Sequence, residues 1–214
     1  MKLELARRSM KVSSERPISN TAGLRDIRLG AIAVATGFVL FTGSAWSQPH
    51  YHVDPGTSEV HFALGASDHP VEGTFHVTSG DFTLDSQSGA MTGMVTVDAA
   101  SGQSGNQGRD KKMTTSQLKV QTYPTVTFAP ARFSGQVKDT GDSSGQVEGG
   151  FTLLGQAHLI TVPVTVHMEG EHFVATGSFT VPFVSWGVKD PSFMFLKVDK
   201  EVKIDLKLTG TVAR

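Results

Sequence analysis

From His50 to Val212 the chain repeatedly alternates apolar with polar residues, and this period of two limits its fold more than any other feature. In residues 201–208 every second residue is aliphatic, and the residues between them are charged. A β-strand with one buried and one solvent-facing side has this pattern, because its successive side chains point to opposite faces. The same alternation recurs in residues 59–64, 71–77, 81–85, 95–98, 126–128, 147–153 and 161–168. The chain is therefore predicted to be all-β.

Short turn signals separate these stretches, so neighbouring strands are expected to run antiparallel. Clusters of Gly, Pro, Asp, Ser and Glu mark turns at residues 54–56, 65–68, 86–89, 141–145 and 169–171. Residues 99–108 and 134–145 are rich in Gly and Ser and are interpreted as loops. The pattern predicts about eight to ten strands, arranged either as a two-sheet sandwich or as a closed barrel. The many Val, Gly and Ala residues on the apolar faces favour a barrel with room for one ligand.

One segment, residues 109–123, does not follow the strand pattern. A charged run from Arg109 to Lys112 leads into irregularly spaced apolar residues, and Pro124 then ends any helix. The segment is predicted to form one short helix or a few helical turns. In a barrel, such a crossover would cover one end and narrow the access to the interior.

Residues 1–47 have the pattern of a secretory signal peptide with an N-terminal extension. Arg25 and Arg28 lead into an apolar run of 13 residues, 29–41, and small residues follow. A transmembrane helix needs about 20 apolar residues, so cleavage after about Ser47 is expected, with an uncleaved membrane anchor as the alternative. The folded domain is then residues 48–214, in a periplasmic or secreted protein that has no stable membrane insertion after cleavage.

Charge and cysteine content exclude several functional classes. Residues 48–214 contain 12 Lys and Arg against 17 Asp and Glu, a net charge of −5. This net charge does not indicate binding to nucleic acid or to anionic lipid surfaces. The basic cluster from Arg109 to Lys112 is interpreted as the solvated start of the helix. The chain has no cysteine, which excludes disulfides, a thiol nucleophile and a thiolate metal site.

The ordered set of short motifs resembles the YceI-like family of exported lipid-binding proteins. The resemblance spans about residues 50 to 212, and its order is more specific than any single motif. The matching stretches are YHVDP (51–55), SEVHF (58–62), VEGTF (71–75), RDKKM (109–113), YPTVTF (123–128), GFTL (150–153), VPVTV (162–166), WGVKDPSF (186–193) and VKIDL (202–206).

This resemblance implies a single antiparallel up-and-down β-barrel of about eight strands, lipocalin-like, with one short helical crossover. It also implies that the barrel holds a long isoprenoid, of the polyprenyl or quinone type, for storage, shielding or transport. The family has no defined catalytic set. The chain departs from common members at His61 and in the loop 65–70, so the resemblance does not identify the lipid.

Apolar residues on the predicted inner faces are the candidate ligand-binding residues. Arg109, Lys111 or Lys112 at the rim would meet a polar head group of the lipid. The candidates are Phe62, Leu64, Phe75, Val95, Val97, Phe128, Phe151, Phe179, Phe183, Trp186, Phe193, Ile204 and Leu206.

Two other classes of function remain as alternatives. A β-sandwich interaction module with a solid core would have the same alternation, and an enzyme could use a metal bound by histidines such as His50 and His52. The chain contains no Gly-x-Ser-x-Gly motif, and nothing brings a base to a nucleophile. We therefore expect no catalytic residues, no metal and no cofactor. A homodimer is compatible with the sequence, although nothing specific favours it.

Overall fold

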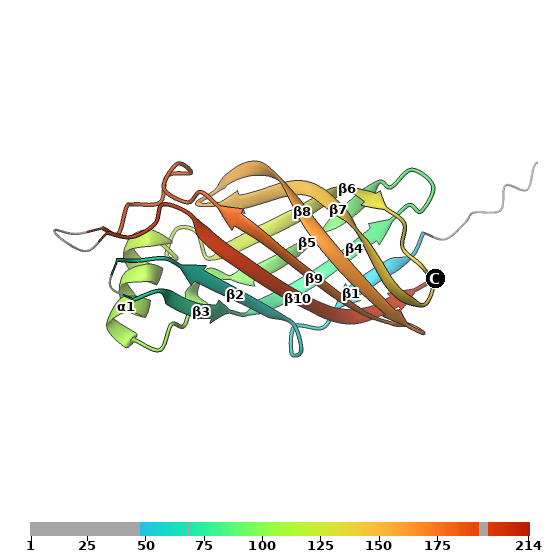
Figure 1. Ribbon diagram of the computed structural model, residues 1–214, viewed down its shortest axis with the longest axis horizontal. Coiled ribbons are helices and arrows are strands. Elements are labelled where there is room, and N and C mark those ends of the chain that lie inside the picture. Colours follow the sequence, from blue (N-terminus) through green and yellow to red (C-terminus); the bar gives the residue numbers. More distant parts are fainter. Residues whose placement is uncertain (1–47, 68, 193–196) are drawn as a thin grey trace, which may run out of the picture. The chain divides into compact units, whose positions relative to one another are not determined.

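The computed structural model describes residues 48–67, 69–192 and 197–214. In these parts of the chain, ten antiparallel strands form one continuous sheet (Figure 1). Pairing of β1 with β10 closes the sheet into a barrel, which confirms the predicted barrel over a sandwich. The strands are β1 (His50–Val53), β2 (Glu59–Leu64), β3 (Val71–Phe75), β4 (Val77–Leu84), β5 (Met91–Asp98), β6 (Thr125–Gly135), β7 (Gly141–Leu153), β8 (Gln156–Glu169), β9 (His172–Val181) and β10 (Val202–Ala213).

The ten strands occupy eight positions around the barrel, because two of these positions each contain a broken strand. One edge of β10 pairs with β9, and its other edge pairs first with β2 and then with β1. In the same way, β3 continues into β4 with a break at His76, and these two strands pair with β2 and β1 respectively. The predicted number of about eight strands is thus the number of barrel positions.

The alternation seen in the sequence sorts side chains between the inside and the outside of the barrel. On β10 the aliphatic residues at 202, 204, 206 and 208 line the interior, whereas Lys203 and Lys207 are exposed. On β9, Ala175 and Phe179 line the interior, and Thr176 and Thr180 between or beside them are exposed.

The prediction of a loop at residues 134–145 is wrong over most of that range, because β6 and β7 extend into it. The two strands pair as far as Gly135 with Gly145. A Cβ atom at Gly145 would lie 2.6 Å from the ring of Phe133, so glycine is required there by a close approach within the ladder. Only residues 136–140 connect the strands, and the backbone N–H of Lys138 donates to the Ser143 hydroxyl (2.9 Å).

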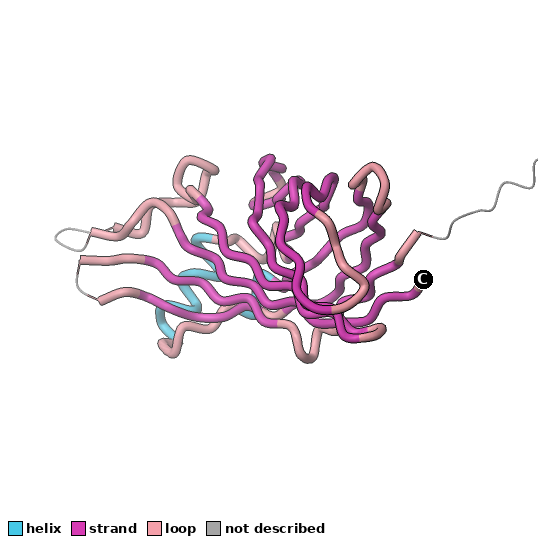
Figure 2. The backbone as a smooth tube through the Cα atoms, turned by 45° about the vertical axis from the view of Figure 1, so that its right-hand side comes forward, coloured by secondary structure: helices cyan, strands magenta, loops and turns pink. Residues whose placement is uncertain are grey.

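Helical segments connect β5 to β6 at one end of the barrel (Figures 1 and 2). They comprise a 3-10 turn, η1 (Ala99–Ser101), the short α-helix α1 (Gln107–Lys112) and a π-helical turn, η2 (Met113–Gln117). Asn106 caps α1 by accepting a hydrogen bond from the Arg109 N–H (3.0 Å). The predicted short helical crossover is confirmed. Within the described residues, no helix is long and apolar enough to cross a lipid bilayer.

The start of the crossover is attached to the free edge of β3. Thr74 and Gln103 exchange two backbone hydrogen bonds (2.9 and 3.0 Å), and the Ser101 hydroxyl accepts from the His76 N–H (2.8 Å). A Cβ atom at Gly73 would lie 2.2 Å from the Gln103 carbonyl oxygen, so the two backbones can meet only because this residue is glycine. We call residues 99–123, which start at this attachment, the lid.

Candidate ligand-binding cavity

A cavity of about 830 Å³ occupies the interior of the barrel. Its wall is formed almost entirely by aliphatic and aromatic side chains from the strands. Inward-facing residues such as Val164, Val166, Leu206 and Leu208 are only half-buried, although they point away from the outer surface. In a filled core these side chains would be fully buried. Their remaining exposed surface therefore faces an internal space, and the solid-core alternative does not describe this barrel.

The structure places most of the predicted ligand-binding residues on the wall of this cavity. Whether they bind a ligand remains a prediction. Those on the wall are Phe62, Leu64, Phe75, Val95, Val97, Phe128, Phe151, Phe179, Phe183, Ile204 and Leu206. Phe193 lies outside the described residues.

Trp186 is the exception, since it is not among the residues that line the cavity. Its ring stacks on His158 of β8, with ring centroids 4.0 Å apart and planes within 5° of parallel. The chain reverses after β9, where the Val188 N–H donates to the Phe183 carbonyl (3.0 Å). This turn directs Phe183 and Val188 to the cavity and Trp186 to β8, which the sequence pattern could not reveal. His158 lies near the start of β8.

Aromatic contacts hold the wall in place in the half of the barrel near the lid. Phe151 and Phe179 meet edge to face with centroids 5.9 Å apart, and Phe62 and Phe75 are 5.4 Å apart. Such pairs favour defined ring positions over a collapsed cluster. The cavity surface is therefore both apolar and ordered before any ligand enters.

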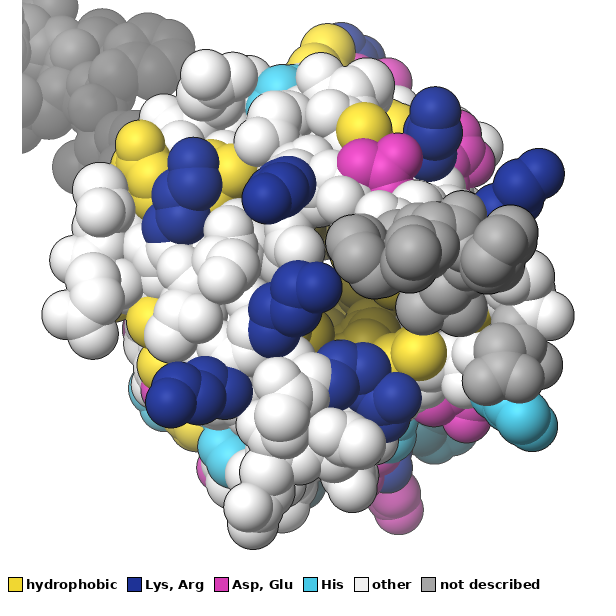
Figure 3. Space-filling model, turned by 90° about the vertical axis from the view of Figure 1, so that its left-hand side faces the viewer, with side chains coloured by type: hydrophobic (Ala, Val, Ile, Leu, Met, Phe, Trp, Pro, Cys, Tyr) yellow, Lys and Arg dark blue, Asp and Glu magenta, His cyan; other side chains and the backbone are white. Residues whose placement is uncertain are grey.

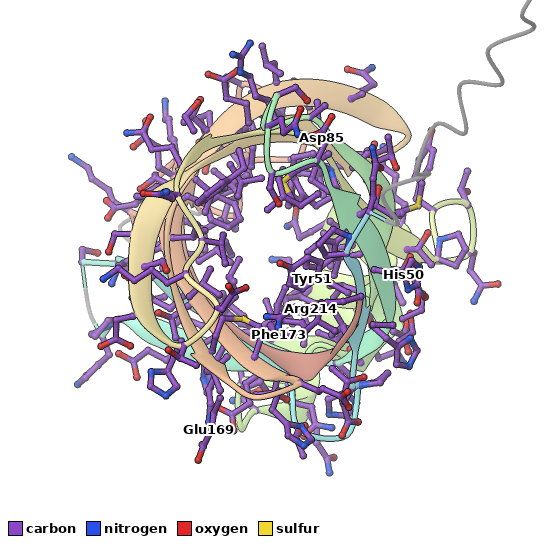
Figure 4. All side chains as sticks on the ribbon, turned by 90° about the vertical axis from the view of Figure 1, so that its right-hand side faces the viewer. His50, Tyr51, Asp85, Glu169, Phe173 and Arg214 are labelled. Carbon is purple, nitrogen blue, oxygen red and sulfur yellow. The ribbon has the colours of Figure 1, made fainter. Side chains whose placement is uncertain are left out.

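A second aromatic group, absent from the predicted site, lines the half of the barrel away from the lid. Tyr51 stacks on Phe82 (centroids 5.0 Å apart) and meets Phe173 edge to face (5.5 Å). Tyr51 and Phe173 lie inside the ring of strands, whereas His50 and Glu169 point outward (Figure 4). Burial raises the pKa of the Tyr51 phenol, although the positive charge of Arg214 partly opposes this effect. The Tyr51 hydroxyl thus lies where the apolar wall meets the ion pair of Arg214 and Asp139.

Polar groups of the lid lie at the other end of the cavity. Arg109, Lys112 and Gln117 are among the residues that line it. The guanidinium of Arg109 donates to the Ser104 hydroxyl and to the Ser104 carbonyl (2.7 Å each). Lys112 has no ion pair within the described part of the chain. The Gln117 side-chain oxygen is buried and has no hydrogen-bond partner there. An unpartnered buried amide is costly, so this atom is suited to bind a ligand group.

The cavity opens toward the surface at the end of the barrel that carries the lid. Figure 3 views this end and shows a hollow through which hydrophobic side chains are visible, with Lys and Arg side chains around it. Asp and Glu side chains lie at the periphery of this face. We call this end of the barrel the mouth. An apolar molecule with a polar or anionic head group fits this arrangement of surfaces.

The histidines do not assemble a metal centre among the described residues. No group of three or more His, Asp and Glu side chains there is close enough to hold a metal ion. His52 contacts Asp81 (2.7 Å) and His167 contacts Asp142 (2.6 Å), both on the exposed outer face of the barrel. These are pairs on adjacent strands, as expected for surface residues of a sheet.

Carboxyl groups with shifted pKa values lie in turns and on the outer wall. The Gln87 N–H and the Ser88 side chain and N–H lower the pKa of Asp85, and Ser192 does the same for Asp190. Hydrogen bonds from Ser178 and Lys203 lower the pKa of Asp205. Local hydrogen bonding explains each of these shifts.

Comparison with known proteins agrees with the fold. The family model of the YceI-like domain matches residues 51–210. The crystal structure of BcnA from Burkholderia cenocepacia is 26% identical, with a TM-score of 0.61, and the match covers 74% of this chain and 99% of BcnA.

Two further solved structures share the fold at lower identity. A polyisoprenoid-binding domain from Saccharophagus degradans is 15% identical, with a TM-score of 0.59 and coverage of 76% of this chain and 98% of that domain. A YceI protein from Campylobacter jejuni is 15% identical, with a TM-score of 0.50 and coverage of 64% and 81%. No curated protein matches this sequence.

Proposed function

The chain belongs to the YceI-like family, and on that premise we propose that its barrel holds one long isoprenoid lipid, of the polyprenyl or quinone type. The observation that carries this proposal is the apolar cavity of about 830 Å³ that runs inside the barrel from the lid to Tyr51. A similar fold in the polyisoprenoid-binding domain from Saccharophagus degradans supports the choice of ligand class. The protein would store, shield or carry the lipid and catalyse no reaction on it.

Apolar burial alone supplies enough free energy for this function. Removing ~400 Å² of isoprenoid surface from water contributes roughly 10 kcal/mol at ~25 cal/mol per Å². Loss of translational and rotational freedom on binding takes back at least ~4 kcal/mol. The remainder of about 6 kcal/mol corresponds to a dissociation constant of tens of micromolar, and each further ~55 Å² of buried isoprenoid tightens binding by about tenfold. The affinity therefore needs no ionic contact, and the polar groups of the mouth serve to orient the lipid.

We propose that the tail of the lipid lies along the barrel and that its head group lies at the mouth. The wall between the ends is apolar, so a polar head within it would lose its hydrogen bonds to water. At the mouth, the Gln117 side-chain oxygen and the Lys112 ammonium have no partner among the described residues and can replace those bonds. A quinone carbonyl, a hydroxyl or a phosphate on the isoprenoid would each find a suitable partner there.

Export is a further part of the proposal. The signal-peptide pattern of residues 1–47 supports a periplasmic or secreted location, where a long isoprenoid is too apolar to move through water without a carrier. This assignment can be tested separately, by determining the N-terminal residue of the protein recovered from the periplasm. A start at about Gln48 is expected, and retention of residues 1–47 would instead support the membrane anchor.

The test of binding uses two adjacent residues of β9 that face opposite sides of the wall. Phe179→Asp puts a carboxylate into the cavity, whereas Thr180→Asp puts one on the exposed outer face, opposite Lys203. We expect Phe179→Asp to lower the uptake of an added polyprenol or long-chain quinone by at least about tenfold, since a buried unpaired charge is very costly. Thr180→Asp should bind like the natural protein. Equal uptake by both folded variants would contradict a lipid inside the barrel.

A further inference from the structure

The charges of the barrel are segregated, although its net charge is negative. Residues 99–123, the lid, carry four cations and one carboxylate, whereas residues 48–214 as a whole have a net charge of −5. Asp110, the one carboxylate of the lid, accepts hydrogen bonds from the backbone and the hydroxyl of Ser104. The hairpins at the opposite end contribute mainly acidic groups: Asp85, Asp139, Asp142, Glu169 and Glu171.

The cations of the lid are available to an external partner. Lys111 and Lys119 are exposed, do not line the cavity, and make no ion pair within the described residues. Lys189 lies on the connection between β9 and β10 and is exposed. It is at the same end of the barrel as the lid, because its neighbour Val188 and Leu118 of the lid belong to one apolar cluster. Figure 3 shows Lys and Arg side chains next to the hollow, with Asp and Glu side chains farther from it.

One exposed apolar side chain lies close to this cationic face. Leu159, on the outer side of β8, is 82% exposed, more than any other large apolar side chain in the described part of the chain. It lies near the mouth because β8 starts beside the lid, where Gly155 approaches the ring of Tyr123. An exposed leucine near a cationic face is typical of surfaces that rest on a lipid bilayer, where the apolar group enters the interface.

We propose that the mouth docks on the surface of a bilayer that contains anionic phospholipids, with the lid facing the membrane. Basic residues are attracted to such a surface, and the acidic hairpins at the far end are repelled by it, so the barrel axis turns toward the membrane normal. The cavity then opens directly onto the bilayer, and an apolar lipid can enter or leave without crossing water. Docking itself does not depend on the proposed isoprenoid ligand, whereas the direct exchange of lipid with the bilayer rests on the proposed function.

The cation distribution favours a bilayer over nucleic acid. The Lys and Arg side chains surround an opening instead of following a continuous groove (Figure 3), and residues 48–98 and 124–214 together carry a net charge of −8. An extended polyanion would meet the acidic walls, whereas a flat anionic surface meets the mouth alone. The net charge of −5 averages over two ends of different sign, so it does not argue against docking through the mouth alone.

The test measures binding to vesicles by co-sedimentation. Vesicles contain either phosphatidylcholine alone or equal parts of phosphatidylcholine and phosphatidylglycerol, at low and at high ionic strength. We expect binding only to the anionic vesicles, and its loss at high salt. The triple variant Lys111→Gln, Lys119→Gln, Lys189→Gln spares every cavity-lining residue, and at roughly fivefold per lysine we expect it to bind on the order of a hundredfold more weakly.

A matched control variant distinguishes the effect of cations at the mouth from the effect of the net charge of the protein. The triple variant Arg132→Gln, Lys138→Gln, Lys207→Gln removes the same charge from the far end and the outer wall, and it should keep its binding to anionic vesicles. Equal weakening by both triple variants would overturn the proposal, and so would equal binding to neutral and anionic vesicles or no binding at all. Uptake of polyprenol from detergent should be unchanged in the control variant and in the double variant Lys119→Gln, Lys189→Gln, which keeps Lys111. Failure of the natural protein to take up polyprenol would contradict the proposed function, but it would not affect the proposal of docking.

Discussion

The substitution Ala175→Phe distinguishes a hollow barrel from a filled one. Ala175 lies on the inner face of β9 between Leu208 and Val166 of the adjacent strands, and all three line the cavity. In a filled core an added ring forces its neighbours apart and costs ~1–3 kcal/mol. Here the ring enters a space of about 830 Å³ and meets no such resistance.

The expected magnitude follows from the surface that the new ring removes from water. Burying ~100 Å² more apolar surface would stabilise the empty barrel by about 2.5 kcal/mol, at ~25 cal/mol per Å². Part of the ring stays in contact with the cavity, so we expect a gain between zero and about 2 kcal/mol in the free energy of unfolding. The ring also shortens the space for a ligand, so the longest polyprenols should bind less well than shorter ones.

Urea denaturation of the lipid-free protein and uptake of polyprenols of increasing length are the two assays. Thr176→Phe, one residue along β9 and exposed on the outer face, is the control for strand propensity and added apolar surface. A loss of ~1–3 kcal/mol in Ala175→Phe but not in Thr176→Phe would refute the hollow interior. An unchanged length preference would show that the lipid does not pass Ala175.

Three further predictions concern the two ends of the barrel. Burial raises the pKa of the Tyr51 phenol above 10.0, so its neutral form contributes to the stability of the fold. This contribution is complete below pH 10 and is lost as the pH rises through the folded-state pKa. In Tyr51→Phe this alkaline loss of stability, measured by urea denaturation, should disappear. Gly73→Val should destabilise the protein by ~1–3 kcal/mol and make the lid sensitive to limited proteolysis, because the valine side chain collides with Gln103. Gly150→Val places its side chain in open space and should have neither effect. Gln117→Leu should stabilise the empty barrel by ~1–3 kcal/mol, because it removes an unpaired buried amide, and should abolish the preference for a prenol over a hydrocarbon of equal length. Greater stability of the natural protein than of Gln117→Leu would contradict an unpartnered amide.

The periodicity of the sequence predicts strands and their faces well, because both depend on neighbouring residues. The inward positions of Phe62, Phe151 and Leu206 follow from alternation alone, and the structure places all three on the cavity wall. Alternation does not show whether the apolar faces meet one another or surround a space. That depends on closure of the sheet by β1 and β10, which are separated by most of the chain.

Contacts between distant parts of the chain are predicted less well, because they do not depend on neighbouring residues. Trp186 is as apolar as its neighbour Phe183, but a reversal of the chain directs the two side chains to different places. Phe82 stands on a predicted apolar face, and only its stacking with Tyr51 and Phe173 from two other strands shows that these three line one region. The glycines at 135 and 145 resemble loop residues in the sequence, yet they allow the Phe133 ring to lie against the ladder.

The central claim is that the barrel carries an isoprenoid, and the most direct test is to identify what the protein contains. The protein is purified gently without added lipid, its intact mass is measured under native conditions, and its organic extract is analysed by mass spectrometry. We predict one long isoprenoid per barrel, with an intact mass that exceeds the chain mass by that of the lipid in the extract. A lipid-free protein that also fails to take up added polyprenol or quinone would contradict the account.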